Sequence, residues 1–81
     1  MTAEQRKELG DLRTELGKVT ALIREKKFDE AEQILADAEQ KLESIATAAG
    51  VQTTDRTMSG IAPLIKRHRD SLEKAMVRAG A

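Results

Sequence analysis

The sequence lacks cysteine, tryptophan and tyrosine, and Phe28 is its only aromatic residue. Without cysteine the chain can form no disulfide, use no thiol nucleophile and bind no metal through thiolates. With a single aromatic side chain, its core has to be aliphatic, built from leucine, isoleucine, valine and many alanines. The absence of cysteine also fits a reducing compartment, and we expect a cytoplasmic protein.

The chain also has no net charge, because 14 basic residues balance 14 acidic ones. Polyanion-binding proteins usually carry a basic excess, so the composition argues against a general nucleic-acid binder. No apolar run approaches the roughly 18 residues of a membrane span, and the polar start MTAEQRKELG is unlike a signal peptide. The length of 81 residues suits one domain, 1–81, which is either a whole protein or a part cut from a longer chain.

The spacing of a helix capping box occurs twice, at residues 2–5 (TAEQ) and 29–32 (DEAE). In such a box the first side chain accepts from the third helical amide, and the last side chain reaches back. The first box predicts a helix over residues 3–26 and the second a helix over 30–49. Gly50 then provides the left-handed residue that commonly ends a helix.

A longer polar loop is predicted for residues 51–60, which are rich in turn-forming residues. Pro63 follows this loop, and proline is best tolerated in the first turn of a helix. The third helix is therefore predicted over residues 60–79, with Gly80 after its end.

Each predicted helix carries an apolar stripe with alternating steps of three and four residues, the pattern of helices packed along one another. The stripes are Leu9, Leu12, Leu16, Val19 and Ile23; Ala31, Leu35, Ala38, Leu42, Ile45 and Ala49; and Ile61, Ile65, His68, Leu72, Ala75 and Ala79. They predict an all-α fold, an antiparallel three-helix bundle with coiled-coil-like packing. In the register that best matches the last two stripes, Leu42 faces His68, while Glu32 and Glu43 lie near Arg78 and Arg67.

Small residues form a second stripe on the first helix, at Gly10, Thr14, Gly17 and Ala21. At 100° per residue this stripe lies opposite the leucines. Glycine inside a helix costs about 1 kcal/mol relative to alanine, and a closely approaching partner helix would explain that cost. We interpret the stripe as a docking face for another protein or for a second copy; the alternative is drift on a solvent-exposed surface.

Basic residues line one face of the third helix, at Arg67, Lys74 and Arg78. Such a stripe can contact phosphates, which dominate non-specific affinity for nucleic acids. It can also pair with the acidic second helix, and the interruptions at Asp70 and Glu73 favour this second interpretation.

His68, the single histidine, lies on the apolar stripe of the third helix. A phosphate acceptor or proton switch would use such a residue. No second metal ligand accompanies it, and Arg69-Asp70-Ser71-Leu72 does not match phosphotransfer signatures. The sequence favours a structural histidine.

Residues 19–38 include Lys27-Phe28-Asp29-Glu30-Ala31, where an aromatic residue precedes an acidic pair and an alanine. This stretch resembles a tetratricopeptide-type helical hairpin, and it is similar to hairpins that recur in large bacterial multidomain proteins. The family's small glycine position is Val19 here, and no second copy of the motif is present. The resemblance implies protein–protein contact and no chemistry.

No catalytic constellation is present, since the carboxylates lie on solvated faces and no serine or threonine has an evident base. We expect no enzyme, no cofactor and no metal site. The sequence favours a non-catalytic interaction or structural module that presents helix faces to a partner or to itself. The alternative is a nucleic-acid-binding domain that uses the basic face of the third helix.

Overall fold

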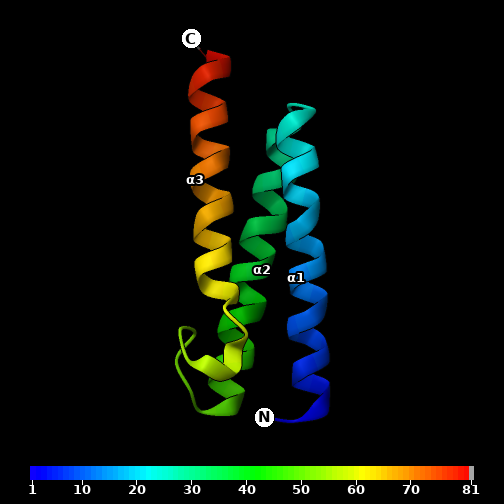
Figure 1. Cartoon of the computed structure of the whole chain (residues 1–81), viewed down its shortest axis with the longest axis vertical. Coiled ribbons are helices and arrows are strands. Elements are labelled where there is room, and N and C mark those ends of the chain that lie inside the picture. Colours follow the sequence, from blue (N-terminus) through cyan, green and yellow to red (C-terminus); the bar gives the residue numbers. More distant parts are fainter. Residues whose placement is uncertain (81) are drawn as a thin grey trace.

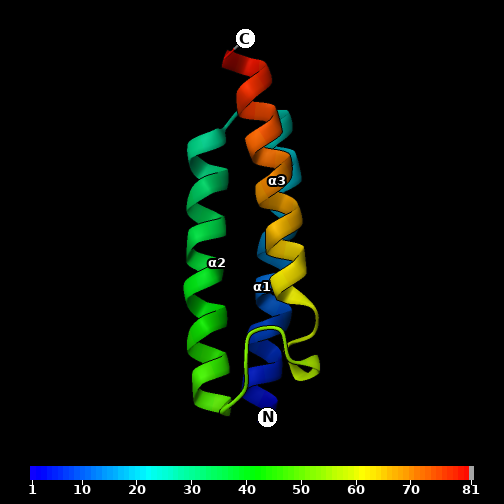
Figure 2. The same cartoon turned by 90° about the vertical axis from the view of Figure 1, so that its left-hand side faces the viewer.

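Three helices packed side by side make up the structure, a computed structural model that describes residues 1–80. The helices are α1 (Ala3–Arg24), α2 (Phe28–Ala49) and α3 (Ile61–Gly80), and each contacts the other two. Figures 1 and 2 show α2 running antiparallel to both α1 and α3. The predicted all-α three-helix bundle is confirmed. The last residue of the predicted domain, Ala81, lies outside the described residues.

The first capping box forms as predicted. The amide of Gln5 donates to Thr2 Oγ1 at 3.1 Å, and the amide of Thr2 donates to Gln5 Oε1 at 2.9 Å. Helix α1 ends two residues before the predicted position 26, because Lys26 adopts a left-handed φ of 61°. The amide of Lys27 then donates to the carbonyl of Leu22 at 2.8 Å, which closes the turn.

The second predicted capping box is wrong. Helix α2 begins at Phe28, and its N-cap Lys27 makes no side-chain capping bond. Asp29 is already inside the first turn, where its own backbone is helical, so its side chain cannot cap. The carboxylate there still complements the helix dipole. The C-terminal end is as predicted, with Gly50 in the left-handed region and the amide of Val51 bonded to the carbonyl of Ala46 at 3.0 Å.

The predicted loop 51–60 contains a short 3-10 helix, η1 (Arg56–Met58), which the sequence analysis missed. The carboxylate of Asp55 caps it, accepting from the amide of Thr57 at 3.0 Å and from its hydroxyl at 2.7 Å. These two bonds lower the pKa of Asp55. The turn brings Met58 into the core, where it is fully buried. Helix α3 then begins at Ile61, one residue after the predicted start, with Pro63 in its first turn as predicted. Gly80, predicted to follow the end of the helix, is its last residue.

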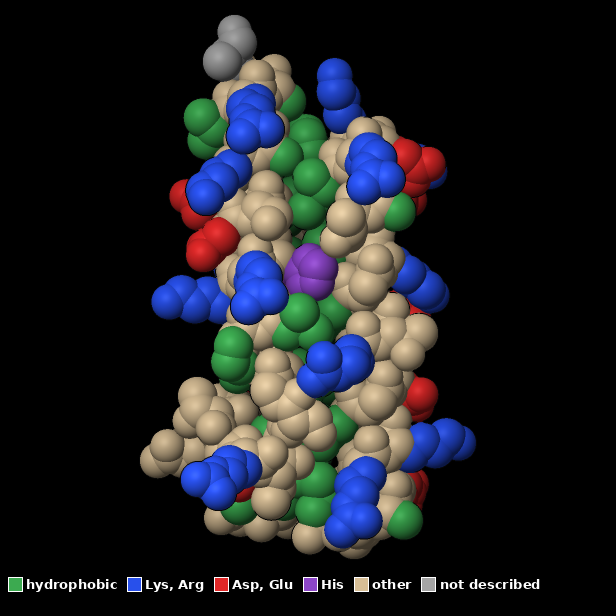
Figure 3. Space-filling model, viewed as in Figure 1, with side chains coloured by type: hydrophobic (Ala, Val, Ile, Leu, Met, Phe, Trp, Pro, Cys, Tyr) green, Lys and Arg blue, Asp and Glu red, His purple; other side chains and the backbone are tan. Residues whose placement is uncertain are grey.

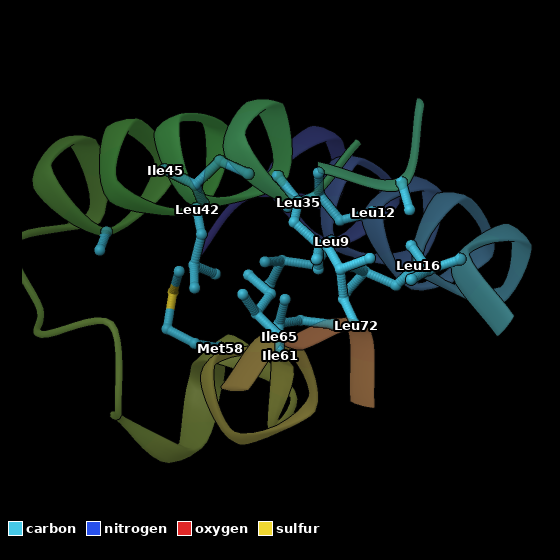
Figure 4. Close-up of a cluster of buried hydrophobic side chains, with 14 residues drawn as sticks. Leu9, Leu12, Leu16, Leu35, Leu42, Ile45, Met58, Ile61, Ile65 and Leu72 are labelled. Atoms are coloured by element: carbon cyan, nitrogen blue, oxygen red, sulfur yellow. The ribbon is translucent and has the colours of Figure 1, made fainter. Parts of the chain in front are cut away.

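The core is formed largely by the predicted apolar stripes, together with Met58 (Figure 4). Its members are Leu9, Leu12, Leu16, Val19, Ala31, Leu35, Ala38, Leu42, Ile45, Ala46, Met58, Ile61, Ile65 and Leu72. The predicted stripe fails toward the end of α3, where His68 and Ala75 are half-buried and Ala79 is exposed.

The predicted register between α2 and α3 is also wrong. Glu32 pairs with Arg69 at 3.0 Å instead of with Arg78, and Arg69 also pairs with Glu39 at 2.8 Å. The loop after α2 folds back along that helix, so α3 begins part-way along it (Figure 2). The end of α3 consequently extends past the α1–α2 turn (Figure 1), which leaves Ala79 without a partner.

Candidate binding surfaces

The small-residue stripe lies on the surface of α1 that faces away from the core, as the helix geometry predicted. Gly10, Thr14, Gly17 and Ala21 are all exposed. A Cβ atom added to Gly10 or to Gly17 would have no neighbouring atom within 4 Å. Packing within the bundle therefore does not require either glycine. We call these four residues the outward face of α1.

Positive charges border the outward face of α1 on both sides. By helix geometry, Lys7 and Lys18 lie along one edge and Arg6 and Arg13 along the other. All four side chains are exposed. Lys18 pairs with Glu15 at 3.0 Å, in the direction of α2. The outward face of α1 is thus a strip without charge between two basic edges.

The predicted basic residues of α3, Arg67, Lys74 and Arg78, are exposed as well. The sequence also allowed these residues to pair with the acids of α2, but in the structure Arg69 pairs with two of those acids, Glu32 and Glu39. None of the three makes an ion pair within the described residues 1–80. Their positive charge therefore faces solvent.

A row of arginines on α1, which was not predicted, lies beside them. The guanidinium of Arg13 donates to the backbone carbonyl of Ser59, just before α3, so this flank of α1 faces α3. Arg6 and Arg24 lie seven and eleven residues from Arg13, which returns them to the same flank within about 20°. The seven- and eleven-residue spacing of these arginines in the sequence could have predicted this row.

Together the two rows cover one side of the molecule, which we call the basic face: Arg6, Arg13, Arg24, Arg67, Lys74 and Arg78. Figure 3 views this side, with α3 and α1 in front. Lysine and arginine side chains are spread over both helices, and acidic side chains are fewer in this view; those of α3 lie beside its basic side chains.

The acids of α1 and α2 lie on the other sides of the bundle. Glu8, Asp11 and Glu15 of α1 line a surface groove together with Lys41 and Ser44 of α2. Glu32 and Glu39 are engaged by Arg69 between α2 and α3. A chain without net charge is therefore divided into a basic side and more acidic sides.

His68 lies between α3 and α1, at the middle of the basic face (Figure 3). Its imidazole is half-buried, not facing Leu42 in the core as predicted. Partial burial lowers its pKa below 6.5, and the nearby positive charge of Arg67 lowers it further. The ring is therefore largely neutral at pH 7.

Within residues 1–80 no three side chains of histidine, cysteine, aspartate or glutamate come together as a metal site. No polar or charged residue is buried in that part of the chain. None of its helices combines the length and apolar character needed to cross a bilayer. The structure thus offers surfaces for binding but no enclosed polar site.

Comparison with protein-family models, with curated proteins and with solved structures found no match to this chain. The tetratricopeptide-type resemblance of residues 19–38 therefore stays a prediction.

Proposed function

We infer that the chain is a non-catalytic helical module for protein–protein contact, which docks a helix of a partner on the outward face of α1. The observation that carries this proposal is the open space over Gly10 and Gly17. Each glycine costs about 1 kcal/mol of helix stability relative to alanine, and the bundle itself gains nothing from either. A partner helix gains from both, because small residues let two backbones approach closely.

The charges beside this face favour a partner helix with acidic flanks. Lys7 and Lys18 on one edge, and Arg6 and Arg13 on the other, would each meet a carboxylate on such a helix. The same face of a second copy would bring like charges together. Charge therefore supports a foreign partner over self-association through α1.

The test compares the proteins captured from the source organism by three immobilised forms of the chain. The first is the wild type, and the second, G10Q/G17Q, fills the outward face of α1 while improving helix propensity. The third, S44Q/A48Q, adds the same side chains at two exposed positions of α2 and serves as the matched control.

We expect a partner that the wild type and S44Q/A48Q both capture and that G10Q/G17Q loses. Circular dichroism establishes that all three forms are equally helical. If the three forms capture the same proteins in the same amounts, the outward face of α1 is not a docking surface and the proposal fails.

A further inference from the structure

We propose that the basic face binds the sugar–phosphate backbone of double-stranded nucleic acid. This function goes beyond docking of a protein helix, and it uses the flank of α1 that faces α3. It rests on the charge, the geometry and the side-chain types of that surface.

The charge on this surface is predominantly positive, and its basic residues are not held in ion pairs inside the described part of the chain. None of its six basic residues has an ion-pair partner within residues 1–80, although the whole chain carries 14 acidic residues. Glu8, Asp11 and Glu15 of α1 line a groove with α2, and Arg69 holds two acids of α2.

On α3, Asp70 and Glu73 line a surface groove with Lys74 and Arg78, so carboxylates border that end of the basic face. Phosphates that approach the basic face still meet six basic side chains without ion-pair partners among the described residues, and their binding releases counterions.

The geometry suits an extended ligand. Arg6 and Arg24 are separated by 18 residues of continuous helix, which is about 27 Å. Arg67 and Arg78 form a parallel row of about 16 Å on α3. Phosphates follow one another every 3.4 Å of axis per strand and a duplex completes a turn in about 34 Å, so the longer row spans most of one turn. Because both rows lie on helices, their spacing is fixed before the ligand binds.

The side chains of the basic face fit phosphate. Five of its six members are arginines, whose planar guanidinium groups donate two parallel hydrogen bonds to phosphate oxygens.

An anionic membrane is a poorer match. Interfacial helices bind membranes by burying large apolar side chains beside their basic residues. The exposed large hydrophobic residues of the described chain are Met1, Met76 and Val77. Met76 and Val77 line a groove with Glu32 on the α2 side of α3, and Val77 also borders Lys74 and Arg78. A single valine beside the basic residues is too little apolar surface for this mode of binding.

Single-stranded nucleic acid is a poorer match as well. Its binding proteins stack bases on aromatic side chains. The only aromatic residue here, Phe28, packs against the hydrophobic core. The residues of the basic face therefore favour binding to the sugar–phosphate backbone of a duplex.

The test is a titration of the full chain against a labelled duplex of about 20 base pairs, followed by fluorescence anisotropy from about 50 to 200 mM salt. R6Q/R67Q/R78Q removes three charges from the basic face and spares Arg13, which also bonds to Ser59. The control K18Q/K41Q/K66Q removes three charges that lie toward α2. The two variants have the same net charge, so any difference between them reports the surface and not the total charge.

We expect the wild type to bind with a dissociation constant of about 1–100 µM, steeply weakened by salt. R6Q/R67Q/R78Q should lose at least about tenfold in affinity, and its salt slope should fall by about 2.7, or 0.9 for each lost phosphate contact. The control should lose less than about threefold.

Equal losses in the two variants would show that the basic face is no specific surface and would overturn the proposal. Tighter binding of a single strand would overturn the choice of a duplex. If polyglutamate displaces the duplex at lower charge concentration than unlabelled duplex does, the natural ligand is an acidic protein and the proposal is also overturned.

Discussion

His68 is the residue whose protonation couples most directly to the packing of α1 against α3. Its pKa is lowered in the folded chain, by partial burial and then by Arg67, whereas the unfolded chain takes up the proton near pH 6.5. Between the two pKa values the unfolded state binds more protons, so the free energy of unfolding falls as the pH drops. Above about pH 6.5 both states are neutral at this residue and it contributes no pH dependence.

We therefore expect urea unfolding to show a free energy that is flat from pH 8 to 7 and declines below about 6.5. The decline should be shallower than the roughly 1.4 kcal/mol per pH unit of a full proton difference, since the imidazole is only half-buried. H68Q, which cannot titrate, should show a smaller decline down to about pH 5.5, where carboxylates are still ionised. Parallel curves for the wild type and H68Q would contradict this assignment.

Met58 is the most deeply buried side chain of the connection between α2 and α3. Met58 is fully buried, whereas Met76, near the end of α3, is 49% exposed. Truncating Met58 to alanine should cost about 2–5 kcal/mol, because it removes buried apolar contacts and leaves a cavity. The same truncation at Met76 should change the free energy of unfolding by less than about 0.5 kcal/mol.

Urea unfolding of M58A and M76A, followed by far-ultraviolet circular dichroism, compares two identical truncations in one protein. Equal midpoints for the two variants would mean that Met58 does not anchor η1 to the core.

Helix ends could be predicted from the sequence where neighbouring residues alone determine them. The capping box at Thr2 and the left-handed Gly50 each satisfy backbone groups within one turn, so the sequence pattern sufficed. The start of α2 was misplaced because backbone bonds, not the carboxylate of Asp29, set the turn at Lys26 and Lys27.

The register of α3 against α2 was not determined locally. Several positions of the two stripes are alanines, which tolerate sliding, and the path of the loop decides where α3 begins (Figure 2). Val51 and Met58, the two apolar residues of an otherwise polar loop, were the signal that this loop packs inward. The same shift moves Arg78 away from Glu32. The spacing of the basic residues could thus be read from the sequence, but whether the acids of α2 pair with them depended on the register.

At the scale of the whole molecule, the bundle closes one hydrophobic core within a single chain of 8.9 kDa. Its described surface is divided into a basic side on α1 and α3 and more acidic sides around α2 (Figure 3). We infer that α1 remains free in the isolated chain, because like charges at its edges oppose pairing of two copies through the outward face. These charges are Lys7, Lys18, Arg6 and Arg13.

Light scattering during size exclusion, over a wide range of protein concentration and at low and moderate salt, tests this claim most directly. The expected result is the monomer mass of 8.9 kDa under every condition, which leaves α1 available to a foreign partner. A defined dimer that G10Q/G17Q converts to monomer and S44Q/A48Q does not would contradict it, because the outward face of α1 would then be occupied by a second copy.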